Sequence, residues 1–241
     1  MTMMRISSEP AYILHKRPYR ESSQILEVFT RNHGRFSLMS KGSRGPRSRT
    51  RGILQPFMPI LVSCYGRGEM PSLRSVDTAD VKPPILKGKA LLSAVYINEL
   101  LMIMLHRHDV HEALFADYHQ VLYQVQAEAD IELVLRNFEK SLLEQLGFGL
   151  NLEIDADSGE PVEAEGHYIY HVEHGPVRSN AESASPLPLL SGRSLLAFSG
   201  GRLGSAQDIA EIKRLMRHVI NHHLGNRKLK SRELFRNRIR S

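Results

Sequence analysis

Residues 23–40 read SQILEVFTRNHGRFSLMS, and this stretch decides the fold. Apolar and polar side chains alternate in Ser23–Thr30 and again in Arg35–Ser40, as they do in half-buried strands. Between them lies Asn32-His33-Gly34, a turn sequence, because asparagine and glycine accept the backbone angles of tight turns. The pattern predicts an antiparallel hairpin near the start of the chain.

Strand-like runs lie on both sides of this hairpin. Ala11–Arg17 is bounded by two prolines, Pro10 and Pro18. Leu54–Tyr65 contains two further prolines, which place its first half at a sheet edge or a bulge, and Met70–Val76 supplies a fifth run. Five short strands in about 75 residues match a small closed barrel of the OB (oligonucleotide- or oligosaccharide-binding) type, although a partial sandwich would give a similar pattern.

A boundary follows the strands at Lys82-Pro83-Pro84, because paired prolines neither pair in a sheet nor continue a helix. Five helical segments follow. Residues 86–106 are apolar nearly all round, as a central buried helix is, and 194–198 is a short helix. In 110–126, 131–146 and 207–224 the apolar residues recur at helical spacing. We therefore predict an α+β chain: a five-stranded OB-type β-barrel domain (1–81), followed by a mainly α-helical domain (82–241). The helical domain carries an irregular acidic insertion at about 149–187, with one strand-like piece at His167–Val172.

The charge of the chain is unevenly distributed. The net charge is +6, yet residues 1–80 hold 13 Lys/Arg against 6 Asp/Glu, and residues 193–241 hold 12 against 3. Residues 151–192 between these blocks hold 1 against 8. Two basic blocks separated by an acidic segment indicate faces that attract a polyanion, and nucleic acid is the commonest one.

Cysteine usage and hydropathy indicate a cytoplasmic protein. The one cysteine, Cys64, excludes an internal disulfide framework and a Cys-rich zinc site, and it suits a reducing cytosol. The N-terminus has no signal-peptide apolar region. The most apolar stretch, Ala90–Leu105, is interrupted by polar residues and is shorter than the roughly 20 residues of a membrane span.

The strongest local signal for nucleic-acid binding is Lys41–Arg51, which carries five positive charges in eleven residues and no acid. Gly42, Gly45 and Pro46 prevent regular structure, so we expect a loop between barrel strands that lays its cations over phosphates. The candidate contacts are Lys41, Arg44, Arg47, Arg49 and Arg51. The alternative is a solvated basic loop without a partner.

Further cations extend the candidate set. Lys16, Arg17 and Arg20 lie beside Tyr19, and a ring next to cations suits base stacking, although a turn with solvated charges would look the same. We add Arg35 to the candidate DNA contacts. A C-terminal cluster, which either neutralises phosphates or forms a charged tail, consists of Arg227, Lys228, Lys230, Arg232, Arg236, Arg238 and Arg240.

Catalytic patterns fail one by one. The sequence has neither a GxxxxGK[ST] phosphate loop nor a GxSxG elbow. His167, His171 and His174 lie in a strand-like segment, where their spacing does not align them for a metal, and Cys64 lies in an apolar run. We therefore predict no catalytic residue, no metal site and no cofactor, and hence no enzyme.

Arg136 lies on the polar flank of the third predicted helix. Its simplest partner is Glu132, four residues earlier, in the favourable i,i+4 orientation. The alternative is an anchor for an acidic, apolar peptide tail that docks in a groove between helices. Spacing alone favours the ion pair.

Six runs of sequence together resemble the RecO family of bacterial recombination mediators, and most closely its proteobacterial branch. They span nearly the whole chain, in order: Glu21–Thr30, Lys41–Arg44, Leu54–Phe57, Gly66–Glu69 with Leu73-Arg74, Tyr96–Leu101, and Leu229–Phe235. The resemblance implies an N-terminal OB domain, binding to single- and double-stranded DNA, ATP-independent annealing, and help in loading the RecA recombinase on SSB-coated DNA. It implies RecR and the C-terminal tail of the single-stranded-DNA-binding protein SSB as partners, and a nucleoid-associated location.

The resemblance also bears on individual residues. The loop Lys41–Arg51 matches part of the family's DNA-binding domain, and Arg136, within Leu135-Arg-Asn-Phe138, matches a position near the pocket for the SSB tail. Some members carry a four-cysteine zinc module, whereas residues 148–175 here contain no cysteine, so we expect that module to be absent.

Two alternatives for the function stay open: a protein–protein adaptor that binds the SSB tail, and an RNA-binding OB protein.

Overall fold

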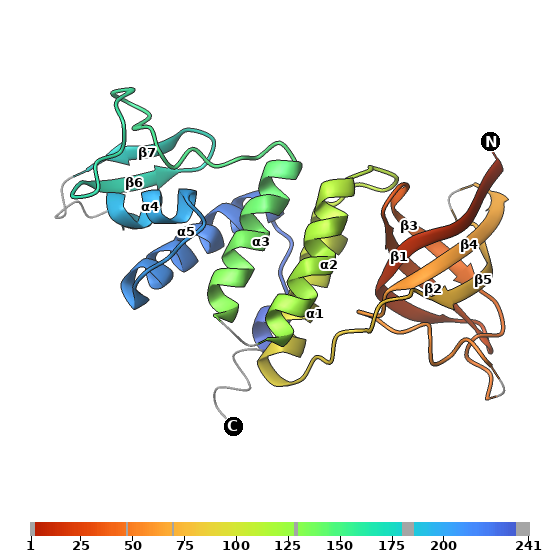
Figure 1. Ribbon diagram of the computed structural model, residues 1–241. Helices are drawn as coiled ribbons and strands as arrows, with labels where there is room; N and C mark the ends of the chain where they lie inside the picture. Colours follow the sequence, from red (N-terminus) through yellow and green to blue (C-terminus); the bar gives the residue numbers. More distant parts are fainter. Residues whose placement is uncertain (1–2, 47, 69, 128–129, 180–185, 235–241) are drawn as a thin grey trace. The chain divides into compact units, whose positions relative to one another are not determined.

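The computed structural model describes residues 3–46, 48–68, 70–127, 130–179 and 186–234 (Figure 1). The chain divides into two compact units. Unit 1 comprises Met1–Glu128 together with Leu229–Ser241, and unit 2 comprises Ala129–Lys228. These units are groups of residues that pack together. The predicted domains, 1–81 and 82–241, concern parts that fold independently, so the boundary at residue 81 stays a prediction.

The first part of unit 1 is a closed five-stranded barrel. Its strands, in the order β1-β2-β3-β5-β4 around the barrel, are β1 (Met3–Tyr19), β2 (Ser23–Thr30), β3 (Gly34–Ser40), β4 (Ile60–Arg67) and β5 (Ser72–Thr78). All neighbours pair antiparallel except β3 and β5, which pair in parallel. The predicted fold class, an OB-type barrel followed by helices, is confirmed.

The first strand is longer than predicted and runs through both of its prolines. β1 pairs with β4 over its first half and with β2 over its second half. Pro10 fits because a register shift between Ile6 and Glu9 interrupts the pairing with β4 just before it. Pro18 fits because it stands next to the end of the strand. β4, in contrast, begins at Ile60, directly after Pro59, and not at Leu54.

The interior of the barrel is a single apolar cluster. Alternate residues of the strands supply it, and Ile13, Val28, Phe36 and Val62 are fully buried. Cys64 is part of the same cluster, and burial raises the pKa of its thiol to about 11. Cys64, which the sequence placed in an apolar run, is therefore a buried thiol of the barrel core.

Two helices of unit 1, α1 (Gly88–Met104) and α2 (Glu112–Gln126), cover the outer face of β1 and β2. Phe29 packs against Phe115 of α2, with the ring centroids 5.4 Å apart. Asn98 of α1 donates from Nδ2 to the Leu14 carbonyl at 2.9 Å and accepts from the Tyr118 hydroxyl at 2.6 Å. As a result β2 is buried on both faces after Ser23, whereas β4 and β5 expose their outward side chains.

Unit 2 combines three helices with a small sheet. The helices are α3 (Ile131–Gln145), α4 (Gly192–Ser199) and α5 (Ala206–Leu224). The sheet, in the order β7-β6-β8, contains β6 (His167–His171), β7 (Gly175–Arg178) and β8 (Leu189–Ser191). Only β6 was predicted, because strands of four and three residues are too short to show a period.

The chain returns to unit 1 after α5. The Glu99 carboxylate of α1 accepts hydrogen bonds from the backbone amides of Lys230 (2.8 Å) and Ser231 (2.9 Å) and from the Ser231 hydroxyl. Leu229 and Ser231 are buried there. Residues 96–101 and 229–231, which belong to two of the six runs quoted above, therefore meet in the fold. Within the described part of the chain, no helix has the length and apolar character needed to cross a membrane.

Candidate nucleic-acid interface

Two of the predicted basic clusters meet at one end of the barrel. The backbone amide of Arg44, in the β3–β4 loop, donates to the Ser22 carbonyl in the β1–β2 turn at 2.9 Å. The Arg44 guanidinium donates to the carbonyl of Arg20 in the same turn at 3.1 Å. These bonds join cations that are more than twenty positions apart in the sequence into one surface.

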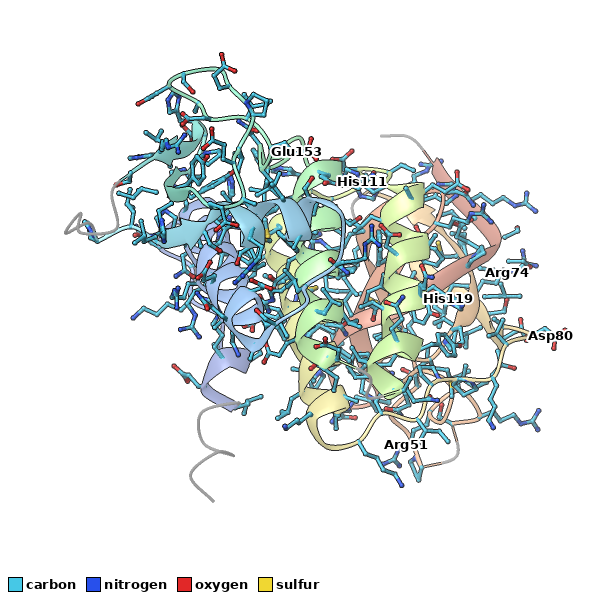
Figure 2. All side chains as sticks on the ribbon, turned by 60° about the vertical axis from the view of Figure 1, so that its left-hand side comes forward. Arg51, Arg74, Asp80, His111, His119 and Glu153 are labelled. Carbon is cyan, nitrogen blue, oxygen red and sulfur yellow. The ribbon has the colours of Figure 1, made fainter. Side chains whose placement is uncertain are left out.

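We call this surface the basic end, defined by Arg17, Arg20, Lys41, Arg44, Arg49 and Arg51. All six side chains are exposed, and Arg51 projects away from the ribbon (Figure 2). Within the described ranges, none of the six forms an ion pair with an acidic side chain. Cations without an acidic partner attract phosphates without first having to break an ion pair. Arg47 lies outside the described residues.

The small polar residues of the loop hold its shape. Gly42 has φ +67°, and its carbonyl accepts from the Gly45 amide at 3.3 Å. The Ser43 hydroxyl is buried and donates to the Ser40 carbonyl at 3.1 Å, while the Ser48 and Thr50 hydroxyls bond to each other at 3.1 Å. These hydroxyls stabilise the loop, and the exposed guanidinium groups remain as its outward donors.

Lys16 lies beside the basic end and is held by hydrogen bonds within the barrel domain. Its ammonium donates to the Leu54 carbonyl at 3.2 Å and to the Gln55 side chain at 2.5 Å, which ties β1 to the segment before β4. Partial burial lowers the pKa of Lys16, and the neighbouring Arg51 lowers it further. The Arg20 guanidinium stands 5.3 Å from the centre of the Tyr19 ring, so a cation occupies one face of that ring.

Arg35 differs from the other candidates, because it is buried against the segment that follows α1. Its guanidinium pairs with Glu27 at 3.0 Å and donates to the Leu105 carbonyl at 2.9 Å. Burial lowers the pKa of Arg35, and the Glu27 charge partly offsets this effect. We therefore remove Arg35 from the candidate DNA contacts and assign it to the packing of β2 and β3 against the segment after α1.

Arg136 is also buried, with 6% of its surface exposed. It pairs with Glu139 at 2.8 Å, one turn later on α3. The predicted pair with Glu132 is wrong, because Glu132 forms an ion pair with Lys213 of α5 at 2.8 Å. Among the described residues, the Arg136 Nε makes no hydrogen bond, so one buried donor of this guanidinium is unsatisfied.

The other sequence candidates are dispersed. The part of the chain that the structure describes contains no group of three or more His, Cys, Asp and Glu side chains arranged to hold a metal. Of the histidine trio, His174 faces Asp157 at 3.1 Å. In the C-terminal cluster, Arg227 donates to the Leu224 carbonyl at 3.2 Å, whereas Arg236, Arg238 and Arg240 lie outside the described residues.

Comparisons with known proteins cover nearly the whole chain. Residues 4–81 match the family model "Recombination protein O N terminal", and residues 86–233 match "Recombination protein O C terminal". The chain is 44% identical over 232 residues to the DNA repair protein RecO of Methylococcus capsulatus, covering 96% of this chain and 94% of the relative. It is 39% identical over 232 residues to that of Aromatoleum aromaticum, covering 96% of both chains. With two family models in sequence order and relatives of matching length, the chain belongs to the RecO family of DNA repair proteins.

Proposed function

We propose that the chain is a DNA-binding recombination mediator that anneals complementary strands without ATP and assists RecA loading on SSB-coated DNA. Family membership supports a role in DNA repair and recombination. The observation that carries the finer proposal is the basic end, where separate segments place exposed cations on one surface. Cations there would screen the repulsion between two phosphate backbones while leaving the base edges free to pair. Such a mechanism makes and breaks no covalent bond and needs no catalytic residue.

The proposal is tested by annealing two complementary single strands coated with SSB, without ATP, at two salt concentrations. Annealing that requires the protein and weakens with salt is the expected result. Absence of annealing together with intact binding to SSB would leave a protein–protein adaptor instead. Equal or tighter binding to RNA oligomers in a parallel competition would favour an RNA-binding protein.

The first prediction concerns the arginines of the basic end. Replacing Arg44, Arg49 and Arg51 with alanine should weaken DNA binding and lower the slope of log affinity against log salt by about 0.7 for each lost contact with a single strand. Fluorescence anisotropy across a salt series measures both quantities. The matched control replaces Arg202, Arg214 and Arg217, three exposed arginines of unit 2, and removes the same total charge. Equal losses in both variants would mean that net charge and not this surface binds DNA.

For unit 2 we propose that Arg136 receives the acidic C-terminal tail of SSB. In support, the buried guanidinium has a donor, Nε, without an acceptor among the described residues. Its other contact, Glu139, is an acid that a carboxylate from a partner would have to displace or join. RecR and, indirectly, RecA complete the proposed partners, without a surface assigned to either.

The second prediction separates binding of the SSB tail from folding. Arg136→Gln alone should destabilise unit 2 by about 3–5 kcal/mol, because it removes the cation that pairs with the buried Glu139 carboxylate. Arg136→Gln combined with Glu139→Gln removes both charges, so it should recover much of the stability but not the affinity for a fluorescent SSB-tail peptide. Glu139→Gln alone should bind the peptide at least as tightly as the unchanged chain. Peptide binding by the stable double variant would remove Arg136 from the site.

A further inference from the structure

The face of the barrel opposite to the helices carries an exposed aromatic ring among arginines. Tyr65, on the outer side of β4, is 52% exposed. Three exposed arginines stand on the neighbouring strands or on β4 itself: Arg5, Arg67 and Arg74. We call these four residues the Tyr65 platform.

Strand register places the four side chains on one face. Ile6 of β1 lies opposite Cys64 of β4, and both point into the core, so the next pair, Arg5 and Tyr65, points outward. Arg67 follows Tyr65 by two residues and therefore shares its face. Directly opposed side chains of this kind have Cβ atoms about 5 Å apart, close enough for a ring and a guanidinium to act on one ligand.

Arg74 joins the platform from β5. Its neighbours Leu73 and Ser75 pair with Cys64 and Ser63, so Arg74 is the extra residue of an irregularity in the ladder. Leu73 packs against the core, which turns Arg74 to the outside. Among the described residues, Arg5, Arg67 and Arg74 form no ion pair with an acidic side chain.

The platform also lies where a barrel of this kind has room for a ligand. OB barrels commonly bind oligonucleotides on the face of strands 2 and 3 and with the loops β1–β2 and β4–β5. Here β2 and β3 are buried on their outer side, partly by Phe115 and Tyr118 of α2 and partly by the Arg35 network. The open faces are therefore the basic end, which includes the β1–β2 turn, and the side of β4 and β5.

We propose that the Tyr65 platform is a second single-stranded-DNA site, where a base stacks on Tyr65 and the adjacent phosphates pair with Arg5, Arg67 and Arg74. Exposed aromatic rings beside cations bind single strands of any sequence, because every base offers a face for stacking. The inference rests on the proposed function for its ligand class, and it adds a site that is distinct from the basic end.

The two sites lie at opposite ends of β1. Arg5 pairs with β4 near the start of the strand, and Arg17 pairs with β2 near its end. The path between them along the curved strand is about 40 Å at roughly 3.3 Å per residue. Figure 2 shows Arg74 and Arg51 projecting from well-separated parts of unit 1. One barrel can thus hold two strands at once, which is the encounter that annealing requires.

The experiment uses the absence of tryptophan from the chain. Tyr65→Trp installs a single reporter whose fluorescence should fall when an unstructured oligonucleotide is added and should change little with duplex, whose bases are already stacked. Phe148→Trp, at an exposed aromatic position of unit 2, is the control and should not respond. In parallel, Tyr65→Thr should bind single strands about tenfold more weakly, while Tyr65→Phe, which keeps the ring, stays within about twofold.

The outcomes distinguish the inference from the proposed function. If Tyr65→Thr binds single strands normally while the Arg44, Arg49 and Arg51 variant does not, the platform is refuted and the basic end stands. Equal weakening of single-strand and duplex binding by Tyr65→Thr would also refute it, since stacking would then not be the interaction. If the unchanged chain binds no DNA, the proposed function fails and the platform with it.

Discussion

Glu27→Ala is expected to lower the free energy of unfolding by about 3–5 kcal/mol, because it leaves a buried guanidinium without its counter-charge. The Glu27 carboxylate faces Arg35 at 3.0 Å and Arg107 at 3.0 Å, and it also accepts from the Ser37 hydroxyl. Arg35 and Glu27 are 9% and 8% exposed, so water cannot replace the lost bond. The network joins β2, β3 and the segment after α1, and its loss should loosen the helices from the barrel.

A second Arg–Glu pair in unit 1 provides the control. Arg31 and Glu112 also join the barrel to the helical segment, but their side chains are 53% and 58% exposed. Glu112→Ala should therefore cost less than about 1 kcal/mol. Urea titrations followed by circular dichroism compare the two variants, and the larger loss corresponds to a fall in melting temperature of roughly 10 °C. If both variants unfold at the same urea concentration, the Glu27 network contributes no more than a surface pair.

Gly34→Ala is expected to be at least as damaging, for a reason of shape. Gly34 ends the β2–β3 turn with φ +65°, and a Cβ there would overlap the Asp109 carbonyl and lie 2.9 Å from the Asp109 amide nitrogen. The neighbouring contact fixes this approach, since the His108 amide donates to the Arg35 carbonyl at 2.9 Å. Alanine at this position would therefore have two effects. Its Cβ would push the turn away from the 108–109 segment, and its backbone would have to stay in the left-handed region.

Gly42→Ala separates the cost of a left-handed backbone from the cost of the overlap with Asp109. Gly42 has nearly the same φ, +67°, but a Cβ there would meet nothing within 4 Å. Its replacement should cost about 1–2 kcal/mol, the penalty of the left-handed backbone alone. The difference between the two variants in chemical denaturation measures the close approach at Gly34, and we expect it to exceed 2 kcal/mol. Equal losses would show that the 108–109 segment moves aside at little cost.

Periodicity was sufficient to predict most elements of this fold. The hairpin of β2 and β3 and the helices α2, α3 and α5 lie within a few residues of their predicted positions, because each alternates or repeats over at least six residues. Helix α1 was predicted instead from a long run of residues that is apolar nearly all round. The ends of β1 were wrong, because proline prevents pairing only where its missing N–H would be needed. That depends on which side of the strand its partner lies, and β1 changes partner halfway.

The candidate site was predictable in composition but not in arrangement. The basic run 41–51 was visible as charge, whereas its contact with the β1–β2 turn depends on backbone hydrogen bonds to Arg20 and Ser22. Arg35 was misassigned because charge alone does not reveal that the segment after α1 covers its side chain. Tyr65 gave no signal, since alternation in an apolar run does not show which face of β4 the helices leave open.

The return of residues 229–234 to α1 has a consequence for the order of events during synthesis. Unit 2 is one continuous stretch of chain, whereas unit 1 is interrupted, and the amides that bond to Glu99 are made only after unit 2 is complete. About a hundred residues are translated between the end of the first part of unit 1 and Leu229. The packing of unit 1 is therefore completed only afterwards, when Leu229 and Ser231 are buried in it. Termination of translation shortly before residue 229 would release a chain with a complete unit 2, but the Glu99 carboxylate of unit 1 would lack its donors from residues 230 and 231.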